Sequence, residues 1–258
     1  MSAKLDITIY GGVSLGPNAC SLIAGPRGAT DDADPKMAIL RWSQDAGFRG
    51  FAVNQPLTRI ESLNDGLGTV LCSTPMGSVC VASGEELRSE TICEENGPAA
   101  HGYICGLRRV GRFVYAAGMG RQVYRRIAPA RWERCDDGVL HQGDDFLDIR
   151  GFTSIDGGSE KDLWAVGHRG EVWHLVSGGW SPSDSPTNLL LYGVRVAGEQ
   201  VWVCGQGGLL LRGERGAWHV VHQDIEPEDF VSIECFLGST YAVGARHGVP
   251  AADVRGAS

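Results

Sequence analysis

Clusters of acidic side chains are the residues of this chain whose types and spacing most clearly allow a chemical role. They fall in short stretches between predicted strands, and those to which we assign partner binding are Asp31, Asp32, Asp34, Asp144, Asp145, Glu226, Glu228 and Asp229. Clustered carboxylates can dock a basic protein, because complementary charge raises association rates. They can also bind Ca²⁺, or simply keep surface loops solvated. The run Asp31-Asp32-Ala33-Asp34 lacks EF-hand spacing, so we predict no metal site there.

The seven histidines and eight cysteines follow no pattern typical of a metal or catalytic site. His219 and His222 are three residues apart, which on a strand places their side chains on opposite faces. The cysteines contain no Cys-x-x-Cys pair, which favours reduced, buried thiols over disulfides or zinc ligands. A Gly-x-x-x-x-Gly-Lys phosphate loop and a His-Glu-x-x-His zinc helix are both absent from the sequence. We therefore predict a protein without catalytic residues, metal or cofactor.

The charge and hydropathy of the chain bear on its partners and its location. The 31 acidic and 23 basic residues give a net charge of −8. This balance argues against direct nucleic-acid binding, which needs a concentrated basic surface, and it permits a basic protein partner. No apolar run approaches the roughly 18 residues of a membrane helix, and the N-terminus shows no signal-peptide core. We expect a cytoplasmic protein that does not insert into a membrane.

A phrase that recurs along the chain indicates how these residues are positioned. It consists of an aromatic or apolar triplet, a glycine, a turn, another apolar strand and a tryptophan. Three copies are plain: Tyr115-Ala116-Ala117-Gly118 to Trp132, Trp164-Ala165-Val166-Gly167 to Trp180, and Trp202-Val203-Cys204-Gly205 to Trp218. The offsets from glycine to tryptophan are 14, 13 and 13 residues. Because the offset is nearly constant, we expect these tryptophans to be buried at equivalent positions within or between repeats.

Further copies of the phrase extend the repeat over the whole chain. Tyr241 to Gly244 begins one near the C-terminus, and Leu22 to Gly25 and Val70 to Ser73 fit it nearer the N-terminus. Taking positions 25, 73, 118, 167, 205 and 244 as equivalent gives spacings of 48, 45, 49, 38 and 39 residues. A period of about 40 to 50 residues is typical of a four-stranded propeller blade. We predict an all-β fold, a single β-propeller domain over 1–258 with about six four-stranded blades, and a β-sandwich is the structural alternative.

Ring closure is a separate part of this prediction. After Gly244 only 14 residues remain, enough for about one more strand. The edges of the first and last blades must be paired or they stay exposed. We therefore expect the N-terminal strand Leu5 to Tyr10 to complete the last blade.

The phrase aromatic-Ala-Val-Gly-x-x-Gly-x-Val followed by tryptophan resembles the BNR-like and photosystem-assembly-factor-like repeats of the β-propeller superfamily. The resemblance is best over residues 113–221. The chain lacks the Gly-His and Trp-Asp pairs of WD repeats, and Ser154 to Gly158 begins like a sialidase Asp-box but has no Thr-Trp after it. The resemblance supports the architecture more than any activity, because a propeller hosts many functions.

We interpret the chain as a non-catalytic, protein-binding propeller. Its most specific form is a bacterial immunity protein that binds and inhibits a basic toxin, such as a nuclease effector. This hypothesis rests on the acidic balance, the lack of a recognisable active site and the irregular first two repeats. Two alternatives stay open: a propeller-based glycan hydrolase or lyase with acid and base groups in the central funnel, and an assembly factor for a membrane complex, as the resembled repeats imply.

Overall fold

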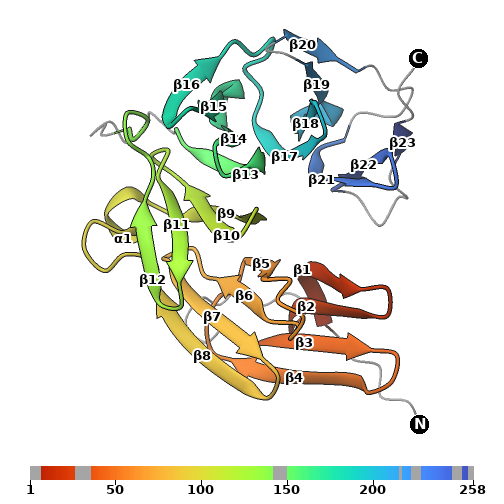
Figure 1. Cartoon of the computed structure of the whole chain (residues 1–258). Helices are drawn as coiled ribbons and strands as arrows, with labels where there is room; N and C mark the ends of the chain where they lie inside the picture. The colour runs from red at the N-terminus through yellow and green to blue at the C-terminus, as the bar shows by residue number, and fades with distance from the viewer. Residues whose placement is uncertain are drawn as a thin grey trace.

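The chain folds into a series of small antiparallel sheets (Figure 1). The computed structural model describes residues 7–26, 36–141, 150–214, 217–221, 228–245 and 252–254, and within these ranges there are six sheets. Every sheet is built from strands that are consecutive in the sequence. The all-β architecture agrees with the prediction.

The first three sheets have four strands each. The first contains β1 (Ile7–Gly16), β2 (Ala19–Pro26), β3 (Met37–Ser43) and β4 (Gly47–Val53). The second contains β5 (Arg59–Ser62), β6 (Val70–Ser73), β7 (Ser78–Ser83) and β8 (Glu86–Thr91), and the short helix α1 (Pro98–His101) follows it. The third contains β9 (Ile104–Val110), β10 (Phe113–Gly118), β11 (Val123–Ala128) and β12 (Arg131–Arg134).

The remaining sheets complete the series. The fourth contains β13 (Phe152–Ser159), β14 (Asp162–Gly167), β15 (Val172–Val176) and β16 (Gly179–Ser183). The fifth contains β17 (Leu191–Ala197), β18 (Gln200–Gly205), β19 (Leu210–Glu214) and β20 (Ala217–Val220). The sixth contains β21 (Phe230–Phe236), β22 (Ser239–Gly244) and β23 (Ala252–Val254). Single 3₁₀ turns, η1 (His168–Gly170) and η2 (Gln206–Gly208), join the second and third strands of the fourth and fifth sheets.

The triplet and glycine that begin each copy of the phrase, with serine in place of glycine at position 73, lie in the second strand of a sheet, and the tryptophans of the three complete copies lie in fourth strands. The repeat read from the sequence is therefore the structural repeat. The turn after the second strand explains the second glycine of the pattern Gly-x-x-Gly, which is Gly170 in the fourth sheet. Gly170 adopts φ +70°, and a Cβ on it would lie 2.0 Å from the carbonyl oxygen of Thr187. Because only glycine combines a positive φ with so close an approach, this turn fixes the spacing between the second and third strands.

The hydrophobic core is divided among the interfaces between successive sheets. Five clusters of buried side chains each join one sheet to the next, from the first and second sheets to the fifth and sixth. The first strands β1, β5, β9, β13, β17 and β21 also contact one another in chain order and lie nearest the centre in Figure 1. The side chains packed between neighbouring sheets therefore form the hydrophobic core. They also hold the sheets, and with them the loops, in place.

The N-terminal strand differs from its prediction. We expected Leu5 to Tyr10 to complete the last blade, but residues 7–10 belong to β1, which pairs with β2 of the first sheet. The third strand of the last sheet is β23, from the C-terminal end of the chain. The physical reason is local: Pro17 and Asn18 form a two-residue turn between β1 and β2, and a short hairpin loop closes at little entropic cost.

Candidate functional site

The structure describes two of the eight acidic residues that we assigned to partner binding. Glu228 and Asp229 lie immediately before β21, in the connection between the fifth and sixth sheets. The other six lie outside the described residues: Asp31, Asp32, Asp34, Asp144, Asp145 and Glu226. Their assignment to a binding face stays a prediction.

Asp229 has a structural role within the connection that carries it. Its carboxylate accepts hydrogen bonds from the Tyr192 hydroxyl, at 3.1 Å, and from the backbone N–H of Gly207, at 2.8 Å. Partial burial and this hydrogen bond to Asp229 both raise the pKa of Tyr192. Glu228 packs against Gly244, where an added Cβ would overlap its carboxylate. Asp229 thus ties the start of the sixth sheet to the fifth, and a charge test of this loop must leave it in place.

One segment of the first sheet has the spacing of a catalytic motif. Gly12-Val13-Ser14-Leu15-Gly16 has the Gly-x-Ser-x-Gly spacing of a nucleophile elbow. That elbow requires a sharp turn from a strand into a helix. Here the five residues lie within β1, and the Ser14 hydroxyl donates to the carbonyl oxygen of Gly16 at 3.1 Å. The pattern therefore forms part of a hairpin and not an elbow.

Metal binding and membrane insertion were also assessed over the described ranges. No group of three or more His, Cys, Asp or Glu side chains there is arranged to hold a metal ion. No helix within the same ranges is long and apolar enough to cross a membrane.

Charged residues of alternating sign link the first strands of five sheets. They are Glu61 in β5, Arg108 in β9, Asp156 in β13, Arg195 in β17 and Glu234 in β21. Arg108 contacts Asp156 at 3.1 Å and lies 3.8 Å from Glu61 and 3.7 Å from Glu234. Arg195 donates to Glu234 at 2.6 Å. Because each charge lies near an opposite one, this network ties together strands from sheets two to six.

The environment of this network shifts the pKa values of Glu61 and Glu234 in opposite directions. Burial raises the pKa of Glu61, although Arg108 opposes that effect. Burial also acts to raise the pKa of Glu234, but its hydrogen bond and ion pair with Arg195 prevail and lower it. The sequence held a signal for this network: Arg108, Arg195 and Glu234 each lie seven residues before the aromatic residue of the phrase.

The phrase tryptophans connect each sheet to the preceding one. Each indole N–H donates to the outer part of the previous sheet: Trp132 to Glu90 at 3.3 Å, Trp180 to the carbonyl oxygen of Cys135 at 2.8 Å, and Trp218 to the Ser183 hydroxyl at 2.9 Å. Trp180 is buried, and Trp132 and Trp218 are partly buried against the same kind of interface. The prediction that the phrase tryptophans are buried within or between repeats is confirmed for Trp180, whereas Trp132 and Trp218 pack at equivalent interfaces but are only partly buried.

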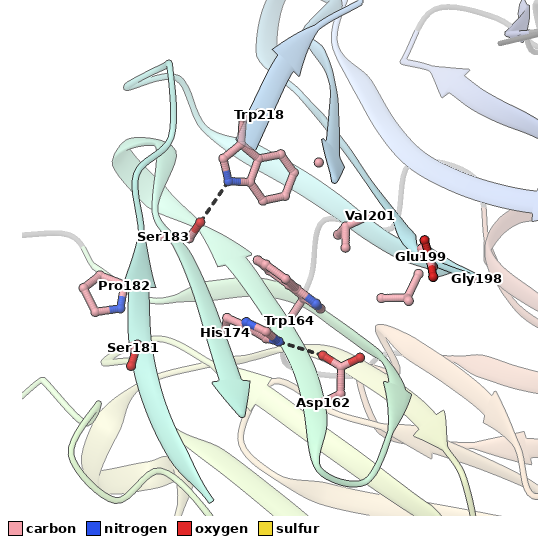
Figure 2. Close-up of a pocket in the computed structure, with 12 residues that line it drawn as sticks. Asp162, Trp164, His174, Ser181, Pro182, Ser183, Gly198, Glu199, Val201 and Trp218 are labelled. Atoms are coloured by element: carbon pink, nitrogen blue, oxygen red, sulfur yellow. Dashed lines mark hydrogen bonds and ion pairs between the residues drawn. The ribbon is translucent and has the colours of Figure 1, made fainter. Parts of the chain in front are cut away.

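A surface pocket of about 530 Å³ lies between the fourth and fifth sheets (Figure 2). The residues that define its chemistry are Asp162, Trp164, His174, Ser183, Glu199 and Trp218. The His174 ring stacks on Trp164 at 3.8 Å with an angle of 9° between the planes, and it hydrogen-bonds Asp162 at 2.7 Å. Trp218 meets Trp164 edge-on at 5.7 Å. Two indole surfaces and two acidic side chains therefore share one pocket.

The pocket follows from small changes in the repeat. Gly213 is the cross-strand partner of Trp218, whereas Arg126 and Leu175 are the partners of the equivalent Trp132 and Trp180. A Cβ on Gly213 would lie 2.6 Å from the Trp218 ring, so the ring packs directly on the glycine backbone. Of the three phrase tryptophans, Trp218 is the one that lies opposite a glycine, and both residues line the pocket. The sequence analysis did not identify the pocket, since only sheet pairing brings these residues together.

Comparison with known sequences finds a curated relative of this chain. No family model matches the sequence. A curated relative, the immune protein Tsi7 of Pseudomonas aeruginosa, is 34% identical over 167 residues, which are 64% of this chain and 54% of the relative. The chain therefore matches about half the length of that relative.

Solved structures support the fold at low sequence identity. The C-terminal WD40 domain of Sif2 has a TM-score of 0.65 at 6% identity and covers 97% of this chain and 82% of its own. YCF48 bound to a D1 peptide has a TM-score of 0.61 at 15% identity, and the match covers 93% of this chain and 90% of YCF48. YCF48 from Cyanidioschyzon merolae has a TM-score of 0.60 at 13% identity and covers 95% and 94%. These likenesses establish the β-propeller fold.

Proposed function

We propose that this chain is an immunity protein, a non-catalytic β-propeller that binds and inhibits a basic toxin such as a nuclease effector. The observation that carries the proposal is the 34% identity to the immune protein Tsi7 over 64% of the chain. A net charge of −8 is complementary to a basic partner and favours fast association with it. We extend the proposal to a cytoplasmic, single-domain propeller of six blades, built from BNR-like and photosystem-assembly-factor-like repeats.

We assign docking to the face formed by the connections between sheets and by the turns between second and third strands. Strand direction alternates within each sheet, so these two kinds of loop emerge on the same face. Glu228 belongs to one such connection. By their place in the sequence, Asp144, Asp145 and Glu226 also lie between sheets, and Asp31, Asp32 and Asp34 lie between β2 and β3. Loops on a rigid scaffold commonly carry binding residues.

Neutralising this face is expected to slow association with the toxin. Two variants each remove two charges, Asp144→Asn with Asp145→Asn and Glu226→Gln with Glu228→Gln. Each should lower the association rate at low salt by about three- to tenfold and flatten its salt dependence, with little effect on dissociation, because rim charges act mainly on encounter. Stopped-flow binding to the toxin, captured from the native organism, measures both rates.

A matched control removes two exposed charges elsewhere. Asp45→Asn with Glu85→Gln alters the turns that end the third strands of the first two sheets. This control should leave the association rate close to that of the unchanged chain. If all three variants associate equally fast at low salt, the acidic face does not dock the toxin.

A further inference from the structure

We infer that the pocket between the fourth and fifth sheets receives an arginine side chain of the bound toxin, an inference that rests on the proposed function. A guanidinium group is planar, weakly hydrated and permanently charged, and it stacks on indole rings while it pairs with carboxylates. The pocket offers both kinds of surface, as Figure 2 shows: the rings of Trp164 and Trp218, and the carboxylates of Asp162 and Glu199.

The charges around the pocket favour a cation. Of the described residues that line it, only His174 can carry a positive charge. The side chain of Asp162 is 43% exposed while it accepts the hydrogen bond from His174. A carboxylate has about four lone-pair sites, so this one can accept from His174 and from a guanidinium together. Glu199 lies in the exposed turn between β17 and β18 and adds a second negative charge at the rim. Turns between first and second strands emerge on the face opposite the connections between sheets. The arginine would therefore belong to a part of the toxin that reaches past the edge of the docking face.

The third sheet shows that an arginine can be held by an aromatic ring and a carboxylate at this level of a blade. There the position equivalent to His174 is Arg125, because Arg125 pairs with Tyr115 as His174 pairs with Trp164. The Arg125 guanidinium lies 4.8 Å from the centre of the Phe113 ring and forms an ion pair with Glu133. The protein thus fills that site with its own arginine, held by an aromatic ring and a carboxylate.

The fourth sheet has different side chains at these positions: Asp162 stands where the third sheet has Phe113, and Ser181 stands where it has Glu133. Its aromatic ring and its carboxylate are those of Trp164 and Asp162. His174 is shorter than arginine and lies flat on Trp164, which leaves the pocket volume unfilled. A second internal example shows the same chemistry: Arg121 lies 4.9 Å from the Trp173 ring and pairs with Glu171 at 2.6 Å. An arginine supplied by the partner would meet the same two kinds of group in the fourth sheet, an indole ring and a carboxylate.

The first test uses a small probe and needs no toxin. N-acetyl-arginine methylamide is titrated into ¹⁵N-labelled protein, and the indole N–H signals of the tryptophans are followed by NMR. We expect the signals of Trp164 and Trp218 to shift in a saturable way, and the neutral N-acetyl-citrulline methylamide to produce less than about a tenth of the effect. Equal shifts with the citrulline probe, or no shift with the arginine probe at tens of millimolar, would overturn the inference.

Matched variants connect the probe to the pocket. Asp162→Asn with Glu199→Gln should abolish the arginine-dependent shifts, while Asp45→Asn with Glu85→Gln should preserve them. Asp162→Asn retains an oxygen that can accept from His174, so the pocket geometry is kept. Ser181→Trp, at an exposed position on the pocket rim, should block the probe by filling the space. Probe binding that survives both the charge variant and Ser181→Trp would place the arginine elsewhere.

The second test measures affinity for the toxin. Both pocket variants should raise the dissociation constant at least tenfold, whereas the Asp45 and Glu85 control should change it less than twofold. If they bind the toxin as tightly as the unchanged chain does, the toxin does not use the pocket and the inference fails while the immunity function stands. If the unchanged chain does not inhibit the toxin, the proposed function fails whatever the probe shows.

Discussion

Replacing Trp180 with alanine is expected to lower the free energy of unfolding by about 3 to 5 kcal/mol, the range for removing a large buried aromatic side chain. Trp180 is 9% exposed and packs in the cluster between the third and fourth sheets. Its ring stacks with Phe152 at 6.0 Å, and its N–H donates to the carbonyl oxygen of Cys135 at 2.8 Å. The substitution therefore creates a cavity and leaves a buried carbonyl without its donor.

Two further variants separate these contributions, measured by equilibrium denaturation in urea. Trp180→Phe keeps most of the packing and loses the hydrogen bond, so it should cost less than Trp180→Ala. Val176→Ala, at a position that is 49% exposed in the same sheet, should cost about 1 kcal/mol or less. A loss below about 1 kcal/mol for Trp180→Ala would show that this indole does not hold the two sheets together.

Breaking the buried ion pair between Arg126 and Glu90 is expected to have an effect of similar size. The pair joins the third sheet to the second through hydrogen bonds of 2.8 and 2.5 Å, and its side chains are only 9% and 6% exposed. Arg126→Met should cost about 3 to 5 kcal/mol, because it leaves a buried carboxylate without its positively charged partner. The double variant Arg126→Met with Glu90→Leu should recover most of that loss, since an apolar pair replaces both charges.

The pH dependence of stability gives an independent test of this pair. Burial acts to raise the pKa of Glu90, but hydrogen bonds from Arg126 and neighbouring groups prevail and lower it. A carboxyl whose pKa is depressed by folding adds stability above its unfolded pKa of about 4.3, and this stability is lost as pH falls through the folded value. The unchanged chain should therefore lose more stability below about pH 4.3 than the double variant does. Parallel acid unfolding curves for the two proteins would contradict this role of Glu90.

The repeat was predictable from the sequence because it depends on local rules. The phrase begins with an aromatic triplet and a glycine, such as Gly167 or Gly205, and a tryptophan follows the glycine at a nearly fixed distance. In each copy the triplet proved to lie in the second strand of a sheet. Strand pairing by short hairpins then gives the sheets. The placement of the N-terminal strand was not predictable from composition, because composition does not show whether β1 pairs with the first sheet or with the last one. The short turn after Gly16 favours pairing with β2 of the first sheet.

The pocket and the charge network depend on contacts between sheets, which the spacing of one strand does not reveal. Asp162 and Glu199 are 37 residues apart and meet only because the fourth and fifth sheets pack together. Arg108 and Asp156 lie 7 and 8 residues before the aromatic residue that begins the phrase in their sheets. Their ion pair could have been predicted from this similar spacing once the first strands were known to be neighbours. Asp229 was predicted as a contact for a partner, and its hydrogen bonds to Tyr192 and Gly207 also give it a role within the chain.

A protection assay with complex isolation tests the central claim most directly. The partner captured from the native organism with this chain is expressed in a bacterial host, alone and together with the chain. We predict that the toxin alone stops growth, that the chain restores growth, and that the two proteins elute as one stoichiometric complex in size-exclusion chromatography. Growth arrest that persists although the chain is soluble and folded, with the two proteins eluting separately, would contradict the claim that this propeller is an immunity protein.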